Sequence, residues 1–227
     1  MPETIQLQKG KTALLIAPYY DSATELGGIV ERSLIPILQS EGMTVLTLEG
    51  EECTYDNLHR ILAEPLEHGY QLADLIVYIG HGLDDMWLGQ IPEQRPMLTE
   101  DDVWLLKDSI VIAIACNTLK YLGNLAVTKG GAKAYIGFID LVLTPVTTEK
   151  MSNRNYKADF VRALMQPTVS LVQGRAVKDA IIEFQDICRY YADMYSEKRY
   201  DLWEFHAFCM LHNADSISYA GKPDAVL

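Results

Sequence analysis

Short uninterrupted apolar runs that alternate with helical patterns constrain the fold of this chain more than any other feature. Such runs occupy residues 12–17, 44–48, 73–79, 109–115 and 134–139. A continuous apolar run of this length is typical of a strand that is buried on both faces of a parallel sheet. Between the runs, apolar side chains recur at intervals of three and four residues, which predicts helices packed against that sheet.

The spacing of these apolar side chains gives the expected helices. They cover residues 26–38, which end before Gly42, residues 58–66 behind a Thr54 cap, residues 99–106, 122–129 and 177–195. We expect the apolar segment 205–211 to form the last strand. The alternation predicts an α/β fold: a three-layer αβα sandwich with a doubly wound, mostly parallel sheet of about six strands. Because no Pro/Gly/Ser linker divides the chain, we expect residues 1–227 to form a single domain.

The charge balance narrows the classes of partner. Lys and Arg number 19 against 31 Asp and Glu, which gives a formal net charge of −12, while 49% of the residues are apolar. A surface this acidic argues against binding to nucleic acid or to an anionic membrane, since both require clustered basic side chains. Basic peptides, metal ions and neutral small molecules remain as partners.

Targeting and cofactor motifs are not evident in the sequence. Residues 1–6 lack the basic and apolar pattern of a secretory signal, and no apolar run is long enough for a membrane span. Gly27-Gly28 lacks the GxGxxG spacing, so we expect no dinucleotide cofactor. The cysteines are scattered and form no CxxC pair, which predicts reduced thiols in a cytoplasmic protein and no metal site. They are Cys53, Cys116, Cys188 and Cys209.

A histidine and a cysteine follow two consecutive predicted strands. The strand at 73–79 leads into Gly80-His81-Gly82, and the strand at 109–115 leads into Cys116. Neighbouring strands lie about 4.8 Å apart, and ligands of open parallel sheets bind beyond their carboxyl ends. The two side chains are therefore expected to share one pocket. A thiol with a pKa near 8.5 is mostly protonated at neutral pH, so it needs an adjacent imidazole to take its proton before it can react.

This pairing predicts acyl transfer. Cys116 would attack a peptide carbonyl, His81 would protonate the leaving amine, and water activated by His81 would hydrolyse the thioester. Gly82 has no side chain, so its N–H can approach a substrate carbonyl. Together with the N–H of Cys116 it would form an oxyanion hole.

The motifs also resemble a known group of enzymes. Residues 77–82 end in His-Gly and residues 111–116 end in Ala-Cys, as in the caspase-type (clan CD) cysteine peptidases. The spacing of the two motifs is similar to that of the gingipain and CHAT branches. Residues 131–137, 174–180 and 205–211 are similar to later segments of the CHAT pattern. The resemblance implies a caspase-like fold and a cysteine endopeptidase that needs no cofactor and acts on a peptide or a specific protein.

The same resemblance suggests residues of the substrate pocket. In these families the loop after the first strand often supplies a pocket residue, which here implies Asp21, with Glu25 as a competitor. A carboxylate there would favour a basic residue on the acyl side of the scissile bond. Asp140, after the strand at 134–139, is a further candidate for the pocket wall.

Two other functions stay open at this point. The segment around Cys116 also resembles the first cysteine motif of aspartate/glutamate racemases, but the second cysteine motif of those enzymes is missing. The chain could also be a catalytically silent or partner-activated caspase-like module that depends on a regulatory protein. Among the other histidines, His59 and His68 are expected to be exposed to solvent.

Overall fold

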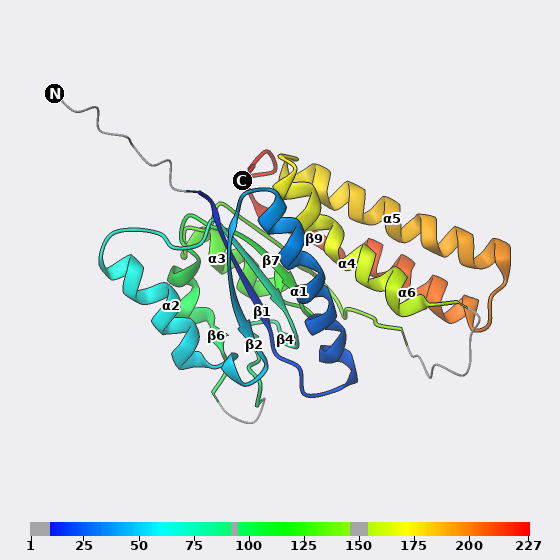
Figure 1. Cartoon of the computed structure of the whole chain (residues 1–227), viewed down its shortest axis with the longest axis horizontal. Coiled ribbons are helices and arrows are strands. Elements are labelled where there is room, and N and C mark those ends of the chain that lie inside the picture. The colour runs from blue at the N-terminus through cyan, green and yellow to red at the C-terminus, as the bar shows by residue number, and fades with distance from the viewer. Residues whose placement is uncertain (1–9, 92–94, 146–153) are drawn as a thin grey trace.

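The computed structural model describes residues 10–91, 95–145 and 154–227 (Figure 1). The predictions made for residues 1–6 lie outside this part of the chain, and the prediction of one domain over residues 1–227 includes residues outside it. No helix in the described part is long and apolar enough to cross a membrane.

The centre of the fold is one sheet of six strands in the order β2-β1-β3-β7-β8-β9. All neighbouring strands pair in parallel except β8 and β9, which are antiparallel. The prediction of a mostly parallel, doubly wound sheet is therefore confirmed. The strands are β1 (Thr12–Ala17), β2 (Thr44–Glu49), β3 (Leu75–Ile79), β7 (Ile110–Ile114), β8 (Ala134–Phe138) and β9 (Ile217–Gly221).

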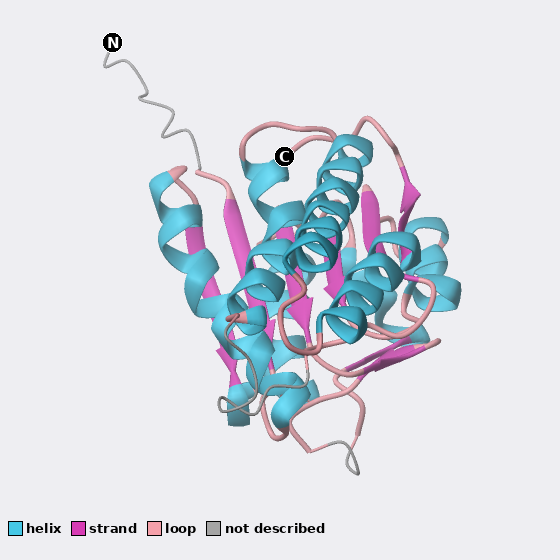
Figure 2. Cartoon of the chain, turned by 90° about the vertical axis from the view of Figure 1, so that its right-hand side faces the viewer, coloured by secondary structure: helices cyan, strands magenta, loops and turns pink. Residues whose placement is uncertain are grey.

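Helices cover both faces of this sheet and make three layers (Figures 1 and 2). One face carries α1 (Ser22–Ser40), α4 (Tyr156–Val172), α5 (Val177–Lys198) and α6 (Trp203–Ser216). The other carries α2 (Tyr55–Glu67), the 3-10 helix η2 (Glu100–Leu106) and α3 (Asn124–Thr128). Two short elements complete the set, namely the 3-10 turn η1 (Gly50–Glu52) and the π-helical turn η3 (Leu119–Gly123).

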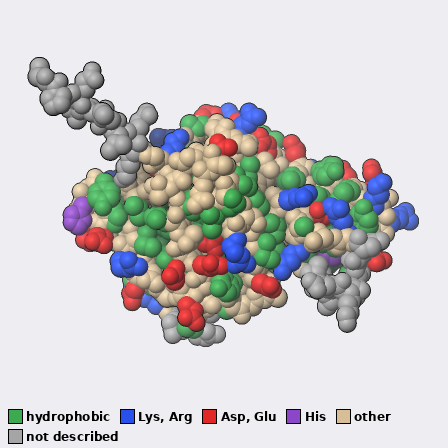
Figure 3. Space-filling view, in the orientation of Figure 1, with side chains coloured by type: hydrophobic (Ala, Val, Ile, Leu, Met, Phe, Trp, Pro, Cys, Tyr) green, Lys and Arg blue, Asp and Glu red, His purple; other side chains and the backbone are tan. Residues whose placement is uncertain are grey.

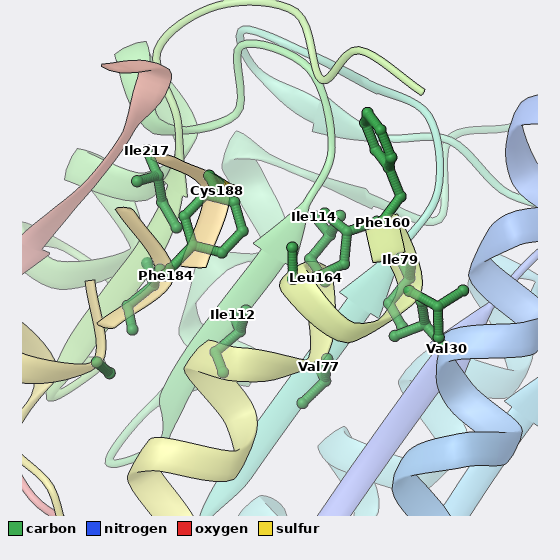
Figure 4. Close-up of a cluster of buried hydrophobic side chains, with 14 of the residues drawn as sticks. Val30, Val77, Ile79, Ile112, Ile114, Phe160, Leu164, Phe184, Cys188 and Ile217 are labelled. Carbon is green, nitrogen blue, oxygen red and sulfur yellow. The ribbon is translucent and has the colours of Figure 1, made fainter. Parts of the chain in front are cut away.

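Alternate residues of each central strand enter different cores. Leu15 and Val77 pack under α1 and α4, whereas Leu14 and Ile76 pack under α2 and η2. Figure 4 shows part of the first core, which α1, α4, α5 and the strands build together. Burial on both faces explains why the strands are continuous apolar runs in the sequence.

A small second sheet extends the carboxyl end of the main one. It consists of β4 (Gly82–Leu83), β5 (Met86–Trp87) and β6 (Leu98–Thr99), in the order β4-β5-β6. Trp87 is fully buried and stacks on Tyr78 of β3, with ring centroids 4.6 Å apart. The indole N–H donates a hydrogen bond to the Tyr135 hydroxyl at 2.9 Å. These contacts fix the small sheet against the strand ends.

The prediction of a last strand at 205–211 is wrong. This segment lies within α6, and the last strand is β9, at the antiparallel edge. The helix buries His206, Cys209, Met210 and Asn213, which follow helical spacing, but Phe205, Phe208 and Leu211 are exposed on its other side. Apolar residues on both sides of the helix hide its period and produce a continuous run like that of a strand.

Charged side chains are spread over the surface. On the face shown in Figure 3, acidic and basic side chains are interspersed. Ion pairs account for part of this pattern, such as Arg32 with Glu49 and Lys178 with Asp224. Pairs this exposed contribute little to stability.

Candidate active site

His81 and Cys116 follow the carboxyl ends of two hydrogen-bonded parallel strands. The register of β3 and β7 pairs Ile79 with Ile114, and the Gly80 N–H donates to the Ile114 carbonyl at 3.2 Å. Each functional residue lies two positions beyond this last pair. His81 and Cys116 line the same cavity. The strand order reverses between β1 and β3, so the cavity also lies where open α/β sheets bind ligands.

The His81 ring is held by a carboxylate. Its Nε2 lies 2.8 Å from Asp21 Oδ2. Because a carboxylate accepts, this contact places the proton of the neutral ring on Nε2 and leaves the lone pair on Nδ1. Nδ1 is then the ring nitrogen that can accept a proton. The Tyr20 ring lies against the same imidazole, with centroids 5.7 Å apart.

Asp21 is held in turn by the start of α1. It is the N-cap residue, and its Oδ1 accepts hydrogen bonds from the N–H groups of Ala23 and Thr24 and from the Thr24 hydroxyl, at 2.8–3.1 Å. Burial opposes ionisation of this carboxyl, but the hydrogen bonds from Thr24 and His81 outweigh it and lower its pKa. Asp21 therefore stays a carboxylate that orients the imidazole.

A buried tyrosine fixes the backbone of His81. The Tyr78 hydroxyl lies 2.5 Å from the His81 carbonyl oxygen and 2.7 Å from that of Leu88. Complete burial raises the pKa of this phenol well above its ordinary value, so it remains a donor. Tyr78 could not be recognised as a site residue from the sequence, because a tyrosine within a buried strand has the pattern of core packing.

Cys116 is the accessible thiol of the chain. Its side chain is half-buried and its Sγ accepts a hydrogen bond from the Val142 N–H at 3.3 Å. The next residue, Asn117, has φ +60°, a left-handed conformation that asparagine tolerates better than most residues. This turn leads the chain from β7 directly into η3.

The other three cysteines are buried in the two cores and have no exposed surface. Burial raises the pKa of the Cys188 thiol to about 12 and that of Cys209 to about 11, and it also raises that of Cys53. None of them lines the cavity of Cys116. The second cysteine that a racemase needs is therefore not present opposite Cys116.

Gly82 lies in close contact with the segment of Cys116. A Cβ atom at Gly82 would lie 2.5 Å from Thr118 Cγ2 and 3.0 Å from the Cys116 carbonyl oxygen. A side chain at this position would therefore separate the two strand ends. The Leu88 N–H donates to the His81 carbonyl, so the next pair of β4 and β5, Gly82 and Trp87, is a non-hydrogen-bonded one. The Gly82 N–H is thus not used by β5.

The loop after β8 covers Cys116 and is held by α6. The Asn213 amide donates to the Leu143 carbonyl at 2.8 Å, and its oxygen accepts the Leu143 N–H at 2.9 Å. His212 Nε2 lies 3.0 Å from the Leu141 carbonyl oxygen. These contacts place Val142 against the sulfur. No motif in the sequence pointed to Asn213, which is distant from Leu143 along the chain.

The carboxylates expected in the substrate pocket lie near the candidate site or on the surface, outside the lining of the cavity of Cys116. Asp21 bonds to His81 and to the start of α1, as described above. Glu25 is exposed and pairs with Lys157 at 3.6 Å. Asp140 is exposed, and its Oδ1 accepts the N–H of Leu141. None of the three lines the cavity, and their assignment to the substrate pocket stays a prediction from the sequence.

Neither His59 nor His68 lines the cavity of Cys116. His68 is exposed, as expected, whereas His59 is partly buried and paired with Asp102. Within residues 10–91, 95–145 and 154–227, no group of three or more His, Cys, Asp or Glu side chains is placed to hold a metal ion.

The fold and the site define a class: an α/β protein with a histidine and a cysteine at neighbouring strand ends, as in clan CD. More narrowly, the chain belongs to peptidase family C25, the gingipain family, whose sequence profile matches residues 12–211. The resemblance drawn from the His-Gly and Ala-Cys motifs is thus confirmed at the level of the family. Its CHAT part stays a prediction.

Comparison with solved structures gives a more distant likeness. The X-ray structure of a secreted C11 cysteine protease from Bacteroides thetaiotaomicron, in complex with an irreversible peptide inhibitor, matches with a TM-score of 0.43 and 12% sequence identity. The match covers 59% of this chain and 50% of that one, so this chain matches about half the length of that protease. Comparison with curated proteins gives no match.

Proposed function

We propose that this chain is a cysteine endopeptidase in which Cys116 is the nucleophile and His81 is the general acid and base. The observation that carries the proposal is the contact between Asp21 and His81 beside a cavity that His81 and Cys116 both line. A thiol, an imidazole with its free nitrogen defined by a carboxylate, and membership of a peptidase family all support this chemistry.

The reaction proceeds in two halves. His81 Nδ1 takes the thiol proton, the sulfur bonds to the carbonyl carbon, and the carbonyl electrons move to oxygen. When the tetrahedral intermediate collapses, the C–N bond breaks and the imidazolium gives its proton to the leaving amine, which leaves a thioester. Water then loses a proton to His81 and attacks the thioester, the acid departs, and the thiolate regains a proton.

The N–H groups of Gly82 and Cys116 bind the oxyanion in this proposal. Two features support the assignment of Gly82: its N–H is not used by β5, and the missing side chain lets it approach the Cys116 segment. Each such donor stabilises the transition state because it is already oriented when the negative charge develops.

We further propose that residues 1–227 act as one domain, with a peptide or protein as the substrate. One sheet with both faces covered by helices supports this. The cytoplasmic location and a regulatory partner stay predictions from the sequence, as does the catalytically silent alternative.

The test is cleavage of a library of denatured-protein peptides, read by mass spectrometry for new internal termini. We expect cleavage by the wild type, none by Cys116→Ala, and unchanged cleavage by Cys188→Ala, which removes a buried thiol as a control. Cleavage that persists in Cys116→Ala would refute the proposal. If the wild type does not cleave while iodoacetamide still alkylates Cys116, the silent or partner-activated module becomes the better description.

A further inference from the structure

The segment that follows β8 lies between Cys116 and the helix α6. We call residues 139–143 the bridging segment. Two of its backbone groups bond to the Cys116 side. The Val142 N–H donates to the sulfur at 3.3 Å, and the Asp140 carbonyl accepts the Asn117 N–H at 3.0 Å. The bridging segment therefore contacts both the candidate nucleophile and the residue that follows it.

Other backbone groups of the bridging segment bond to α6. The Ile139 N–H donates to the Ser216 carbonyl at 2.8 Å, and His212 Nε2 lies 3.0 Å from the Leu141 carbonyl oxygen. Because a carbonyl oxygen only accepts, the imidazole donates from Nε2, and it does so whether or not Nδ1 also carries a proton. The contact of His212 therefore does not depend on the charge of its ring.

The third contact with α6, from Asn213, involves both backbone groups of one residue. Its side-chain oxygen accepts the Leu143 N–H at 2.9 Å, and its nitrogen donates to the Leu143 carbonyl at 2.8 Å. Alternate residues of the bridging segment thus bond to the helix, and the two between them bond to the Cys116 side, as in an extended chain. Only 1% of Asn213 is exposed, so water is poorly placed to replace the amide if it is lost.

We propose that Asn213 is a positioning residue for the reaction, which holds the Cys116 sulfur in place through the bridging segment. The inference rests on the proposed function and adds to it a residue that does not line the cavity of Cys116. Without the amide, the N–H and the carbonyl of Leu143 lose their partners and must turn toward water, which moves the Val142 N–H off the sulfur. A shift of about 1 Å in reacting groups can cost about 10²-fold in rate.

The main test replaces the amide by a carboxyl group. In Asn213→Asp the protonated carboxyl has an O–H donor and an acceptor oxygen, so it can still make both bonds to Leu143. The ionised carboxylate only accepts, and it then faces the Leu143 carbonyl oxygen without a donor. Burial raises the pKa of such a carboxyl above its ordinary value near 3.9, so the donor is lost within a pH range in which activity can be measured.

The measurement is kcat/KM for a peptide that the wild type cleaves, expressed relative to the wild type at each pH. We expect this ratio for Asn213→Asp to fall by at least about tenfold between about pH 5 and about pH 8. Division by the wild-type value removes the titration of His81 and Cys116. Urea unfolding at both ends of the range checks that the variant is folded in the assay, because a merely destabilising change would not give this profile in folded protein.

Two further variants complete the test. Asn213→Leu nearly keeps the size of the side chain and removes both bonds, so kcat/KM should fall at least about tenfold throughout the pH range. Gln71→Glu is the matched control. This half-buried amide also donates to a backbone carbonyl, that of Ala73, but it lies at the opposite end of the sheet, before β3. Its activity ratio should not change with pH.

The two proposals fail in different ways. A ratio for folded Asn213→Asp that does not change with pH, or that changes equally in Gln71→Glu, would refute the positioning role and leave the peptidase standing. A folded Asn213→Leu as active as the wild type would do the same, and if that variant does not fold, the profile of Asn213→Asp decides. No cleavage by the wild type, with Cys116 still alkylated by iodoacetamide, would refute the peptidase, and the positioning role would fall with it.

Discussion

Two histidine–aspartate pairs of similar geometry lie in different parts of this molecule. His81 Nε2 is 2.8 Å from Asp21 Oδ2, and His59 Nε2 is 3.0 Å from Asp102 Oδ1. The first pair lies beyond the strand ends, and its side chains are 36% and 42% exposed. The second lies between α2 and η2, with exposed fractions of 20% and 7%.

The surroundings of the two pairs differ more than their geometry. The His59 ring stacks on Tyr55 at a centroid distance of 3.8 Å and meets the Trp104 ring edge-on. Asp102 also accepts the N–H and the hydroxyl of Thr99, which caps η2. The contacts of the His59–Asp102 pair are ring packing and helix capping, which stabilise the fold. The His81–Asp21 pair, in contrast, lies beside the Cys116 thiol and the cavity. A histidine–aspartate contact alone therefore does not define an active site.

The largest expected difference between the pairs is in catalysis. We predict that His81→Gln lowers kcat/KM for a peptide substrate by about 10²–10⁴-fold, because proton transfer to and from the reacting groups is lost. His59→Gln should change it by less than about threefold, since His59 does not line the cavity. Comparable losses in the two variants, both folded, would show that the two histidine–aspartate pairs do not differ in their role in catalysis.

A third carboxyl, that of Glu31, is buried like Asp102 but does not pair with a histidine, so it can be compared with the two histidine–aspartate pairs. Glu31 on α1 is 1% exposed, and its carboxyl oxygens have no hydrogen-bond partner among the residues that the structure describes. Burial, reinforced by the neighbouring carboxylate of Glu49, raises its pKa to about 8. The unfolded chain ionises this group near its ordinary pKa of 4.5, whereas the folded protein does so only near 8.

This shift gives a prediction with a definite sign. As the pH rises from about 4.5 to about 8, the unfolded state loses the proton first, so the free energy of unfolding falls by a few kcal/mol and levels off above pH 8. Glu31→Gln should abolish this decline when urea unfolding is measured across the range. Glu25→Gln, at an exposed position of the same helix, serves as the control. This variant should still show the decline in the free energy of unfolding. The same decline in Glu31→Gln would show that another group is responsible.

The two aspartates should respond oppositely to the same substitution. Asp21→Asn keeps a good helix cap but loses the charge that fixes the His81 tautomer, so activity should fall at least about tenfold with little loss of stability. Asp102→Asn should lower the free energy of unfolding by about 1–3 kcal/mol and leave the activity nearly unchanged. Measuring kcat/KM and urea unfolding for both variants checks this crossover. A free energy of unfolding that falls in Asp21→Asn as much as in Asp102→Asn would contradict this prediction, because the loss of activity could then come from unfolding.

The smallest effect concerns acid stability. Because the pKa of Asp21 is lowered in the folded protein, its contribution is complete above the ordinary value of 3.8 and is lost as the pH falls through the lower folded pKa. The side chain is exposed, so we expect less than about 1 kcal/mol. The difference in unfolding free energy between the wild type and Asp21→Asn should be constant near neutral pH and shrink below pH 4. A difference that grows on acidification would reverse the assigned sign.

Much of the fold and part of the candidate site could be predicted from the sequence. The buried strands were evident because parallel strands under helices on both faces must be apolar throughout. Thr54 was correctly predicted as a cap, and its hydroxyl accepts the Asn57 N–H. The last strand could not be found, since β9 is a half-exposed edge strand, while α6 carries apolar residues on both of its sides.

The sequence by itself determined that a histidine and a cysteine follow consecutive buried strands, because strand period and strand ends are local properties. Only the tertiary structure decided what surrounds them. Asp21 meets His81, and Val142 meets Cys116, across long stretches of chain that folding brings together. The cavity is apolar because residues from α1, α4, two strands and a loop meet there, and side chains so far apart in sequence carry no local signal of their contact.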